Sequence, residues 1–328
     1  MRKIAILIVA LAALAVAAMA LRSGAAKPTW PSRPVRVIVP MSTGGALDLT
    51  ARLFAERLSE RWQQPVVVDN RPGADSVIGI STFVAAKEDH TLLFSHASPF
   101  TLSPSAGSPI PYDPQLDVVP ISAATSPTIV IAASTSLPVS SLEELVKLAR
   151  ENPGRYFWSG VAGLVDTLFT AFLKIERLEM TQVTYREVSM ALQDLGAGRL
   201  HVWLAAMPSV GSQVQAGKAR LLAVTSSTRS PAAPDIWTVG EAGYPGLTVD
   251  GTFGLYGWRG MPDSLRQKIA ADVRAVAADQ ALVARLAAMG QVARGSTPEE
   301  LAQALDRQRT QVSAILDLLS PKQDWDHR

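Results

Sequence analysis

The sequence predicts an α/β protein made of two units, in which parallel strands are covered by helices. Short runs rich in Val, Ile and Leu alternate with helical patterns over residues 35–94 and again over residues 128–224. A stretch rich in proline and serine at 98–120 separates the two series and is typical of a crossover. The chain has 328 residues, of which 48% are apolar, which suits about two domains that each bury a core.

The first 26 residues have the layout of a secretory signal peptide. Arg2 and Lys3 precede an apolar run from Ile4 to Leu21, and small residues at 18–20 and 24–26 offer cleavage positions. An uncleaved membrane anchor is the alternative, since about 18 apolar residues can span a bilayer. Loss of residues 1–26 removes three basic residues and no acidic one, so the formal charge falls from +2 to −1.

Composition and motifs exclude several classes of function. The absence of cysteine excludes disulfides, thiolate metal sites and a cysteine nucleophile. The mature part has no basic cluster, so we expect no nucleic-acid partner. The sequence contains no Gly-x-Ser-x-Gly, His-Glu-x-x-His or phosphate-loop motif, and its four histidines are not spaced as a metal pair. We therefore expect no metal, no cofactor and no enzymatic activity.

The stretch from Val35 to Trp62 turns from strand to helix and forms the first candidate site. Valines at every second position predict a strand at 35–39, and apolar residues at helical spacing predict a helix at 49–62. Between them, Gly44-Gly45 permits unusual backbone angles, while Ser42 and Thr43 can cap the free amides of the helix start. Such a turn favours a bound anion. A tight turn without a ligand is the alternative.

The remaining elements follow from the same patterns. Proline, glycine and serine interrupt the apolar runs, and a capping pattern at Ser141 to Glu144 marks one helix start. We predict strands at 65–68, 91–94, 128–131, 156–159, 182–185, 201–204, 221–224 and 253–258, and helices ending at Ala86 and spanning 141–150, 165–175, 190–195, 262–278, 280–289 and 298–319.

Several stretches together resemble a known family. They are Arg33-Pro34-Val35-Arg36-Val37-Ile38-Val39-Pro40 with Gly44-Gly45 and Asp48, Val68-Asp69-Asn70-Arg71-Pro72-Gly73-Ala74, Pro111-Tyr112-Asp113-Pro114, Ser141 to Leu148 with Asn152-Pro153-Gly154, Ala216-Gly217-Lys218, Leu222-Ala223-Val224-Thr225-Ser226, Arg229-Ser230-Pro231 and Glu241-Ala242-Gly243. Their order and spacing are similar to those of the Bug family, the periplasmic receptors of tripartite tricarboxylate transporters. The similarity runs from Pro31 to Leu319.

This resemblance implies a two-lobed periplasmic binding protein fold of type II-like α/β class, in which each lobe is a mixed sheet flanked by helices and a hinge joins the lobes. The signal peptide is expected at residues 1–26, lobe 1 at 27–127 and 250–328, and lobe 2 at 128–249. It further implies a small carboxylate ligand between the lobes, held by backbone amides of loops 41–45 and 159–167, and membrane transporter subunits as partners. We expect a periplasmic monomer.

The sequence also departs from the family pattern. The sequence has Asp75-Ser76-Val77 at a turn where the family is usually rich in glycine. It has Thr167 at a position where the family usually has histidine, and Tyr185-Arg186-Glu187 in place of a Tyr-Lys-Gly type turn. His201 and Ala205 stand where an acidic pair is expected. If two of the acids Asp48, Asp75, Asp166 and Glu187 face the cleft, we expect a ligand that carries an amino group. Stabilisation of helix starts is the alternative for these four.

The candidate ligand-binding residues combine the two loops with polar groups near predicted strand ends. They are Met41, Ser42, Thr43, Gly44, Gly45, Asp48, His96, Ser159, Gly160, Val161, Ala162, Gly163, Asp166, Thr167, Tyr185, Arg186, Glu187 and Ala205. Arg186 could clamp a carboxylate or be a solvated surface residue, and His96 could contact the ligand or be an ordinary loop histidine. Two other functions stay open: a sensory co-receptor with the same ligand chemistry, and a secreted hydrolase or isomerase acting on carboxylates.

Overall fold

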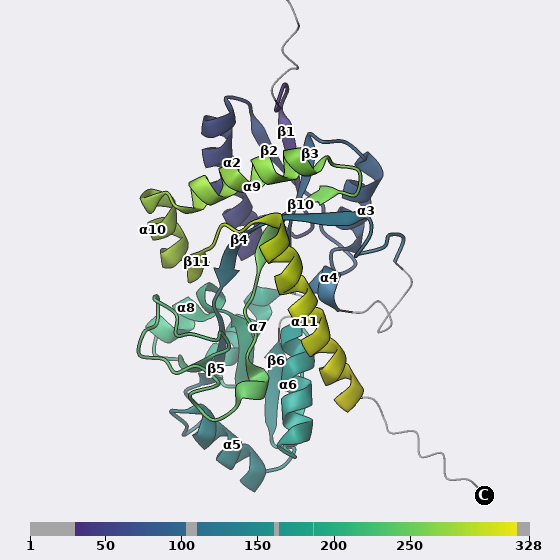
Figure 1. Ribbon diagram of the computed structural model, residues 1–328. Helices are drawn as coiled ribbons and strands as arrows, with labels where there is room; N and C mark the ends of the chain where they lie inside the picture. Colours follow the sequence, from purple (N-terminus) through teal and green to yellow (C-terminus); the bar gives the residue numbers. More distant parts are fainter. Residues whose placement is uncertain (1–29, 103–109, 161–163, 186, 320–328) are drawn as a thin grey trace, which may run out of the picture.

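The computed structural model describes residues 30–102, 110–160, 164–185 and 187–319. It contains two sheets that lie one above the other, each with its own helices (Figure 1). The chain crosses from the first sheet to the second and later returns to the first. The predicted signal peptide and the candidate residues Val161, Ala162, Gly163 and Arg186 lie outside the described residues. None of the helices in the described ranges has the length and apolar character needed to cross a membrane.

The first lobe is built on a six-stranded sheet with the order β11-β4-β10-β3-β1-β2. Its strands are β1 (Val35–Val39), β2 (Val66–Asn70), β3 (Thr91–His96), β4 (Val118–Pro127), β10 (Phe253–Trp258) and β11 (Gln291–Ala293). Its helices are α2 (Ala46–Trp62), α3 (Val77–Ala86), α4 (Ser98–Thr101), α9 (Asp263–Ala277) and α10 (Gln280–Ala288). β1 runs parallel to β2 and β3, whereas β10 is antiparallel to β3 and β4, so the sheet is mixed.

The period-2 pattern of β1 divides the core of this lobe into two layers. Val35, Val37 and Val39 pack in the cluster that contains side chains of α2 and α9. Ile38, which points the other way, packs in the cluster that contains side chains of α3 and α4. Alternate residues of one strand therefore bury both faces of the sheet.

The second lobe is built on a five-stranded sheet with the order β7-β6-β8-β5-β9. Its strands are β5 (Ile129–Ser134), β6 (Tyr156–Gly160), β7 (Met180–Gln182), β8 (Val202–Ala206) and β9 (Ala219–Val224). Its helices are α5 (Leu142–Glu151), α6 (Leu164–Ile175), α7 (Val188–Gly196), α8 (Met207–Gln215) and the 3-10 helix η2 (Pro245–Leu247). The predicted cap of α5 is confirmed, since the Ser141 side chain accepts a hydrogen bond from the Glu144 N–H.

The strand registers place the carboxyl ends of both sets of parallel strands at the junction of the lobes. In the first sheet, Phe253 pairs with His96 and with Thr125, so β3 and β4 end at the same edge. In the second sheet, Ile129 pairs with Ala206, so β8 and its parallel neighbour β6 end where β5 begins. Only Thr128 separates β4 from β5. The edge at which ligands bind in α/β sheets thus faces the junction in both lobes.

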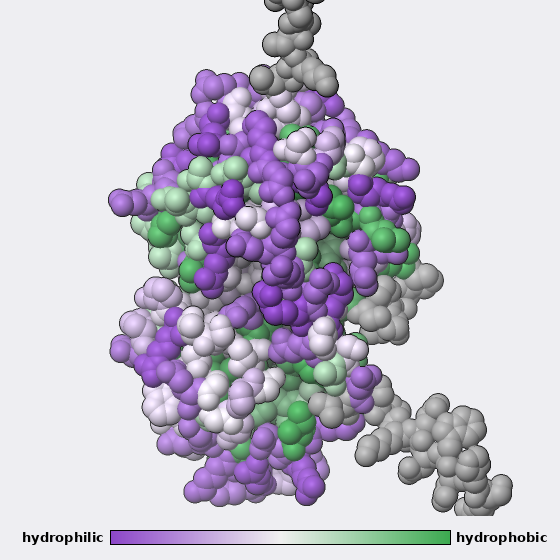
Figure 2. Space-filling model, viewed as in Figure 1, coloured by the Kyte–Doolittle hydropathy of each residue, from purple (hydrophilic) through white to green (hydrophobic). Residues whose placement is uncertain are grey.

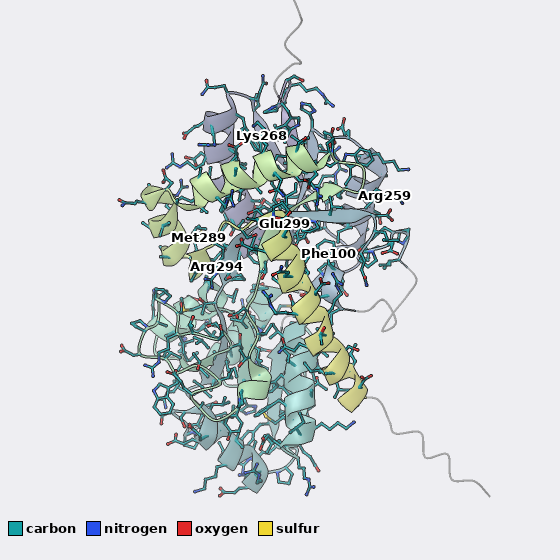
Figure 3. The ribbon with its side chains drawn as sticks, in the orientation of Figure 1. Phe100, Arg259, Lys268, Met289, Arg294 and Glu299 are labelled. Carbon is teal, nitrogen blue, oxygen red and sulfur yellow. The ribbon has the colours of Figure 1, made fainter. Side chains whose placement is uncertain are left out.

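The long C-terminal helix α11 (Pro298–Leu319) packs on both lobes (Figure 1). Leu301 and Leu305 lie in the first-lobe cluster with Phe100, which Figure 3 shows beside the helix. Val312 and Ile315 pack with side chains of α6 in the second lobe. Polar and charged residues cover the exposed face of the first turns of α11 (Figure 2).

Further contacts hold the junction. In the segment that returns from β9 to β10, the Thr248 carbonyl oxygen accepts a 2.7 Å hydrogen bond from Gln311 Nε2 of α11. The Thr128 N–H donates to the Gly290 carbonyl oxygen at 2.9 Å, and Arg294 Nε donates to Ser126 Oγ at 2.8 Å. Figure 3 shows Arg294 at the lower margin of the first lobe, next to the second. The loop after α10 is therefore part of the junction.

Three elements differ from the sequence-based predictions. β4 overlaps the predicted loop at 98–120 and continues through residues for which the sequence predicts no element, because Pro120 and Pro127 are unusual in strands. Pro120 lies at a register shift opposite Tyr256, which is where a sheet tolerates proline. The short α4 forms in the same predicted loop, and β11 has only three residues, too few for a recognisable pattern.

The predicted strand at 182–185 is wrong. β7 spans Met180–Gln182, and the chain leaves the sheet after the Val183 N–H donates to the Trp158 carbonyl oxygen at 2.8 Å. Val183 and Tyr185 have the alternating apolar pattern that predicts a strand. Tyr185 instead packs among side chains of α7 and α8. Tertiary packing overrides the local pattern here.

Candidate functional site

The first predicted loop, Met41–Gly45, joins β1 to α2 at the junction-facing edge of the first sheet, and all five residues are exposed. The prediction that Ser42 and Thr43 cap the helix is wrong: the N-cap is Gly45, and no side chain caps it. The N–H groups of Ser42 and Thr43 donate to no acceptor among the described residues. The loop therefore offers free donors at the positive end of the α2 dipole.

Asp48 lies beneath this loop with 1% of its surface exposed. Its Oδ2 accepts from the Gly44 N–H at 2.9 Å and from Arg52 Nε at 3.1 Å, and its Oδ1 accepts from Asn70 Nδ2 at 2.9 Å. Burial favours the protonated acid, but the hydrogen bonds from Arg52, Gly44 and Asn70 outweigh it and lower the pKa of Asp48. Because the protein occupies both oxygens, Asp48 positions the loop.

Asn70 is a site residue that sequence reasoning missed. It ends β2 at the junction-facing edge, and its Nδ2 also donates to the Met41 carbonyl oxygen at 3.1 Å. Asn70 therefore ties the outer end of the loop to Asp48. The available signal was a polar residue at the carboxyl end of a strand that pairs with β1.

His96 ends β3 at the same edge and is partly buried. Its Nε2 lies 3.2 Å from Ser76 Oγ, and this hydroxyl also lies 3.9 Å from the Met41 sulfur atom. Burial lowers the pKa of His96 to about 4, although the nearby Asp75 charge acts in the opposite direction. His96 is therefore a neutral imidazole at pH 7 and supplies hydrogen bonding, without a positive charge, next to the first loop.

The second predicted loop begins at the junction-facing end of β6. Ser159 is 3% exposed, Gly160 ends the strand, and α6 begins at Leu164. Asp166, in the first turn of α6, accepts hydrogen bonds from Gln182 Nε2 at 2.7 and 2.8 Å. Burial raises the pKa of Asp166, and the Gln182 amide limits the rise. Thr167 follows in the same helix.

The other second-lobe candidates differ in their placement. The Tyr185 hydroxyl donates to Asp194 Oδ2 at 2.9 Å, and burial together with this carboxylate raises the pKa of Tyr185 to about 12. Glu187 is an exposed residue at the N-cap of α7. Ala205 is completely buried between the sheet and the helices α7 and α8, so its side chain belongs to the core.

His201 lies away from the junction. It precedes β8, at the end of the sheet where β6 begins, and its Nδ1 accepts a 3.0 Å hydrogen bond from the Phe157 N–H. Burial lowers the pKa of His201, and its ring stacks on Phe157 with a centroid distance of 5.6 Å. His201 is therefore a structural histidine whose ring bonds within the second lobe.

The structure thus gathers polar groups at both junction-facing edges. The first lobe contributes the Met41–Gly45 loop, Asn70, Ser76 and His96, and the second contributes Ser159, Gly160, Asp166 and Gln182. No three His, Asp or Glu side chains within the described ranges gather as metal ligands.

Comparison with known proteins identifies the family. The family model described as "Tripartite tricarboxylate transporter family receptor" matches residues 50–318. The chain belongs to this family. The receptor is 34% identical over 278 residues to the "UPF0065 protein in tcbD-tcbE intergenic region" of Pseudomonas sp. strain P51, a match that covers 83% of this chain and 82% of the relative. It is 30% identical over 276 residues to protein BugT of Bordetella pertussis, covering 83% and 85% of the two chains.

The receptor also resembles a solved structure described as "R. palustris Rpa4515 with adipate". The two superpose with a TM-score of 0.77 at 28% identity, over 88% of this chain and 98% of the other. The predictions of a Bug-family receptor and of the two-lobed α/β binding fold are confirmed. The receptor is therefore a solute-binding protein of the tripartite tricarboxylate transporter receptor family, as the sequence pattern predicts.

Proposed function

We propose that this receptor captures a small organic acid in the periplasm and presents it to the membrane subunits of a tripartite tricarboxylate transporter. The ligand is a di- or tricarboxylate or a related carboxylate, bound between lobe 1 (27–127 and 250–328) and lobe 2 (128–249). The proposal includes export by the signal at residues 1–26, action as a monomer, and binding without turnover.

The observation that carries the proposal is the set of free N–H donors at the start of α2. Ser42 and Thr43 offer their N–H groups at the edge that faces the second lobe, and the α2 dipole adds partial positive charge there. A carboxylate accepts several such hydrogen bonds at once. The relative whose structure is described with adipate has the same fold, which supports a carboxylate as the ligand class.

One lobe alone cannot bind the acid tightly. A helix start stabilises a bound charge by about 0.3–1 kcal/mol at the surface and by up to about 2 kcal/mol when it is partly buried. A micromolar dissociation constant requires about 8 kcal/mol. The second loop and the exclusion of water must supply the difference. Conversion of a mostly open to a mostly closed population requires about 5.5 kcal/mol in favour of the closed state. The ligand must therefore contact both lobes.

Native mass spectrometry of the freshly purified protein tests the proposal directly, because a bound acid appears as a defined mass increment. Titration of adipate, malate and citrate, followed by calorimetry, then gives the affinities. We expect at least one carboxylate to bind with a micromolar or lower dissociation constant. The absence of a bound acid together with no binding across the panel would contradict the proposal.

A pair of variants localises the binding. Asn70→Ala removes the amide that holds the Met41 carbonyl oxygen and is expected to weaken binding about tenfold, which corresponds to about 1.4 kcal/mol. Glu60→Ala, in the last turn of the same helix α2, removes an exposed ion pair with Arg57 and is expected to leave the affinity unchanged. Proton NMR of the acid panel after incubation checks the prediction that no turnover occurs.

A further inference from the structure

The turn before α3 has an unusual backbone. Ala74, Asp75 and Ser76 have φ angles of 47°, 47° and 77°, and they directly follow Gly73. Three successive non-glycine residues thus occupy the left-handed region, where a side chain costs about 1–2 kcal/mol per residue and glycine costs little. Strain kept at a loop is a reason to look for a function there.

Ser76 does not act as a helix cap, although it occupies the N-cap position of α3. Its side chain makes no capping hydrogen bond, and its hydroxyl lies 3.2 Å from His96 Nε2 instead. Ser76 is 2% exposed and lies beneath Met41. A serine at an N-cap normally bonds the second or third N–H of the helix. Ser76 is therefore used to hold the His96 ring next to the first loop.

The position of this turn is fixed by close packing. A Cβ atom at Gly79, in the first turn of α3, would lie 2.6 Å from Pro40 Cβ and 2.7 Å from the Arg71 carbonyl oxygen. Only a glycine allows α3 to approach the end of β1 so closely. The start of α3 is thereby held against the chain that leads into Met41, so the Ser76 hydroxyl cannot move away from the first loop without repacking the helix.

Asp75, Ser76 and His96 form a corner beside the first loop, and this corner carries no positive charge that would attract a carboxylate. His96 is neutral at pH 7, because burial lowers its pKa to about 4. Asp75 is exposed and lies near enough for its charge to act on the His96 ring. The corner thus combines one carboxylate with two neutral hydrogen-bonding groups. A ligand carboxylate here would be repelled, whereas a hydroxyl or ammonium group could donate to Asp75.

We propose that Asp75 and Ser76 are specificity-determining residues of the first lobe, which select acids that carry a hydroxyl or amino group over plain dicarboxylates of the same length. This inference rests on the proposed function, since it concerns the same ligand site. The free donors of the Met41–Gly45 loop bind a carboxylate of the ligand, and the corner formed by Asp75, Ser76 and His96 reads the substituent beside it.

The test compares matched ligands on the full mature chain. The ligand sets are succinate, malate and aspartate; glutarate, 2-hydroxyglutarate and glutamate; and adipate, 2-hydroxyadipate and 2-aminoadipate. Within the length that binds, we expect the wild type to prefer a substituted acid over the plain one by at least about tenfold, equivalent to 1.4 kcal/mol. If the charge of Asp75 dominates the selection, the amino acid binds better than the hydroxy acid.

Glycine substitutions separate strain from recognition. Asp75→Gly relieves a left-handed residue and is expected to raise the urea midpoint of unfolding. Ser76→Gly relieves the same strain but also loses the contact with His96, so its midpoint is expected to stay near that of the wild type. Both variants are expected to reduce the preference for substituted acids to about twofold or less. Lys87→Gly is the matched control, because Lys87 is exposed, has a φ of 48° and lies at the opposite end of α3. It is expected to raise the midpoint and leave the ligand preference unchanged.

The outcomes distinguish this inference from the function on which it rests. A wild type that binds plain and substituted acids equally, or glycine variants that keep the wild-type preference, would overturn the role of Asp75 and Ser76 and leave the receptor function standing. If the wild type binds no member of any set and carries no acid in native mass spectrometry, the proposed function fails and this inference fails with it.

Discussion

Replacement of Asp48 by alanine tests whether this buried carboxylate holds the first loop. The variant leaves three donors without their acceptor, namely the Gly44 N–H, the Asn70 amide and the Arg52 guanidinium. A hydrogen bond to a charged group contributes about 1.5–3 kcal/mol. Water can reach Arg52, whose side chain is 47% exposed, and it can also reach Gly44, so the loss is partly recovered. We expect Asp48→Ala to lower the free energy of unfolding by about 2–3 kcal/mol.

Urea unfolding with a constant slope measures this change, and ligand titration measures its effect on the loop. We expect the affinity for the bound acid to fall about tenfold or more, because ordering the free loop then costs binding energy. Asp48→Asn keeps one acceptor oxygen and should lose about half as much stability. Glu60→Ala on the same helix should change the free energy of unfolding by less than about 0.5 kcal/mol. A loss below about 0.5 kcal/mol for Asp48→Ala, or an unchanged affinity, would refute the reasoning.

Three further predictions concern other parts of the protein. Burial lowers the pKa of His96 to about 4, so the histidine takes up a proton at a higher pH in the unfolded chain than in the folded protein. The free energy of unfolding therefore falls as the pH drops from about 6.5 to 4. His96→Gln should flatten this part of the pH profile measured by urea unfolding. Asp166 has a pKa raised by burial, so its charged form opposes folding at neutral pH. Asp166→Asn should raise the melting temperature at pH 7, with a gain that shrinks as the pH falls through the raised pKa toward the ordinary value of 3.8. Val312→Ala should lower the free energy of unfolding by about 1.5–3 kcal/mol, measured by urea unfolding, because this buried side chain of α11 packs against the second lobe.

The fold could be predicted because its signals repeat along the chain. The valines at every second position predict the strand β1, and the capping pattern at Ser141 predicts the start of α5. The structure has both. β4 could not be predicted, since Pro120 and Pro127 argue against a strand, and only pairing with β10 and β11 makes it favourable. A strand that is stabilised by partners distant in sequence leaves a weak local pattern.

The site could be predicted as loops but not as contacts. The glycines of 44–45 and the start of α2 indicate a turn with free donors. Nothing in the sequence indicates that Asp48 bonds back to Gly44, or that Asn70, 22 positions later, joins it. The pairing of β1 with β2 brings Asn70 to this place, and such registers depend on tertiary packing. The contact between Ser76 and His96 depends on the relative placement of α3 and β3, which the sequence does not indicate.

The position of α11 restricts how the receptor can open. This helix packs along one side of the junction, with its first turns on one body and its last turns on the other. Because α11 crosses the junction and stays attached to both bodies, it fixes their separation on this side. The side that carries α11 then changes little when ligand enters, and the opposite side changes most. A transporter that must tell a loaded receptor from an empty one would gain that information from the side away from α11.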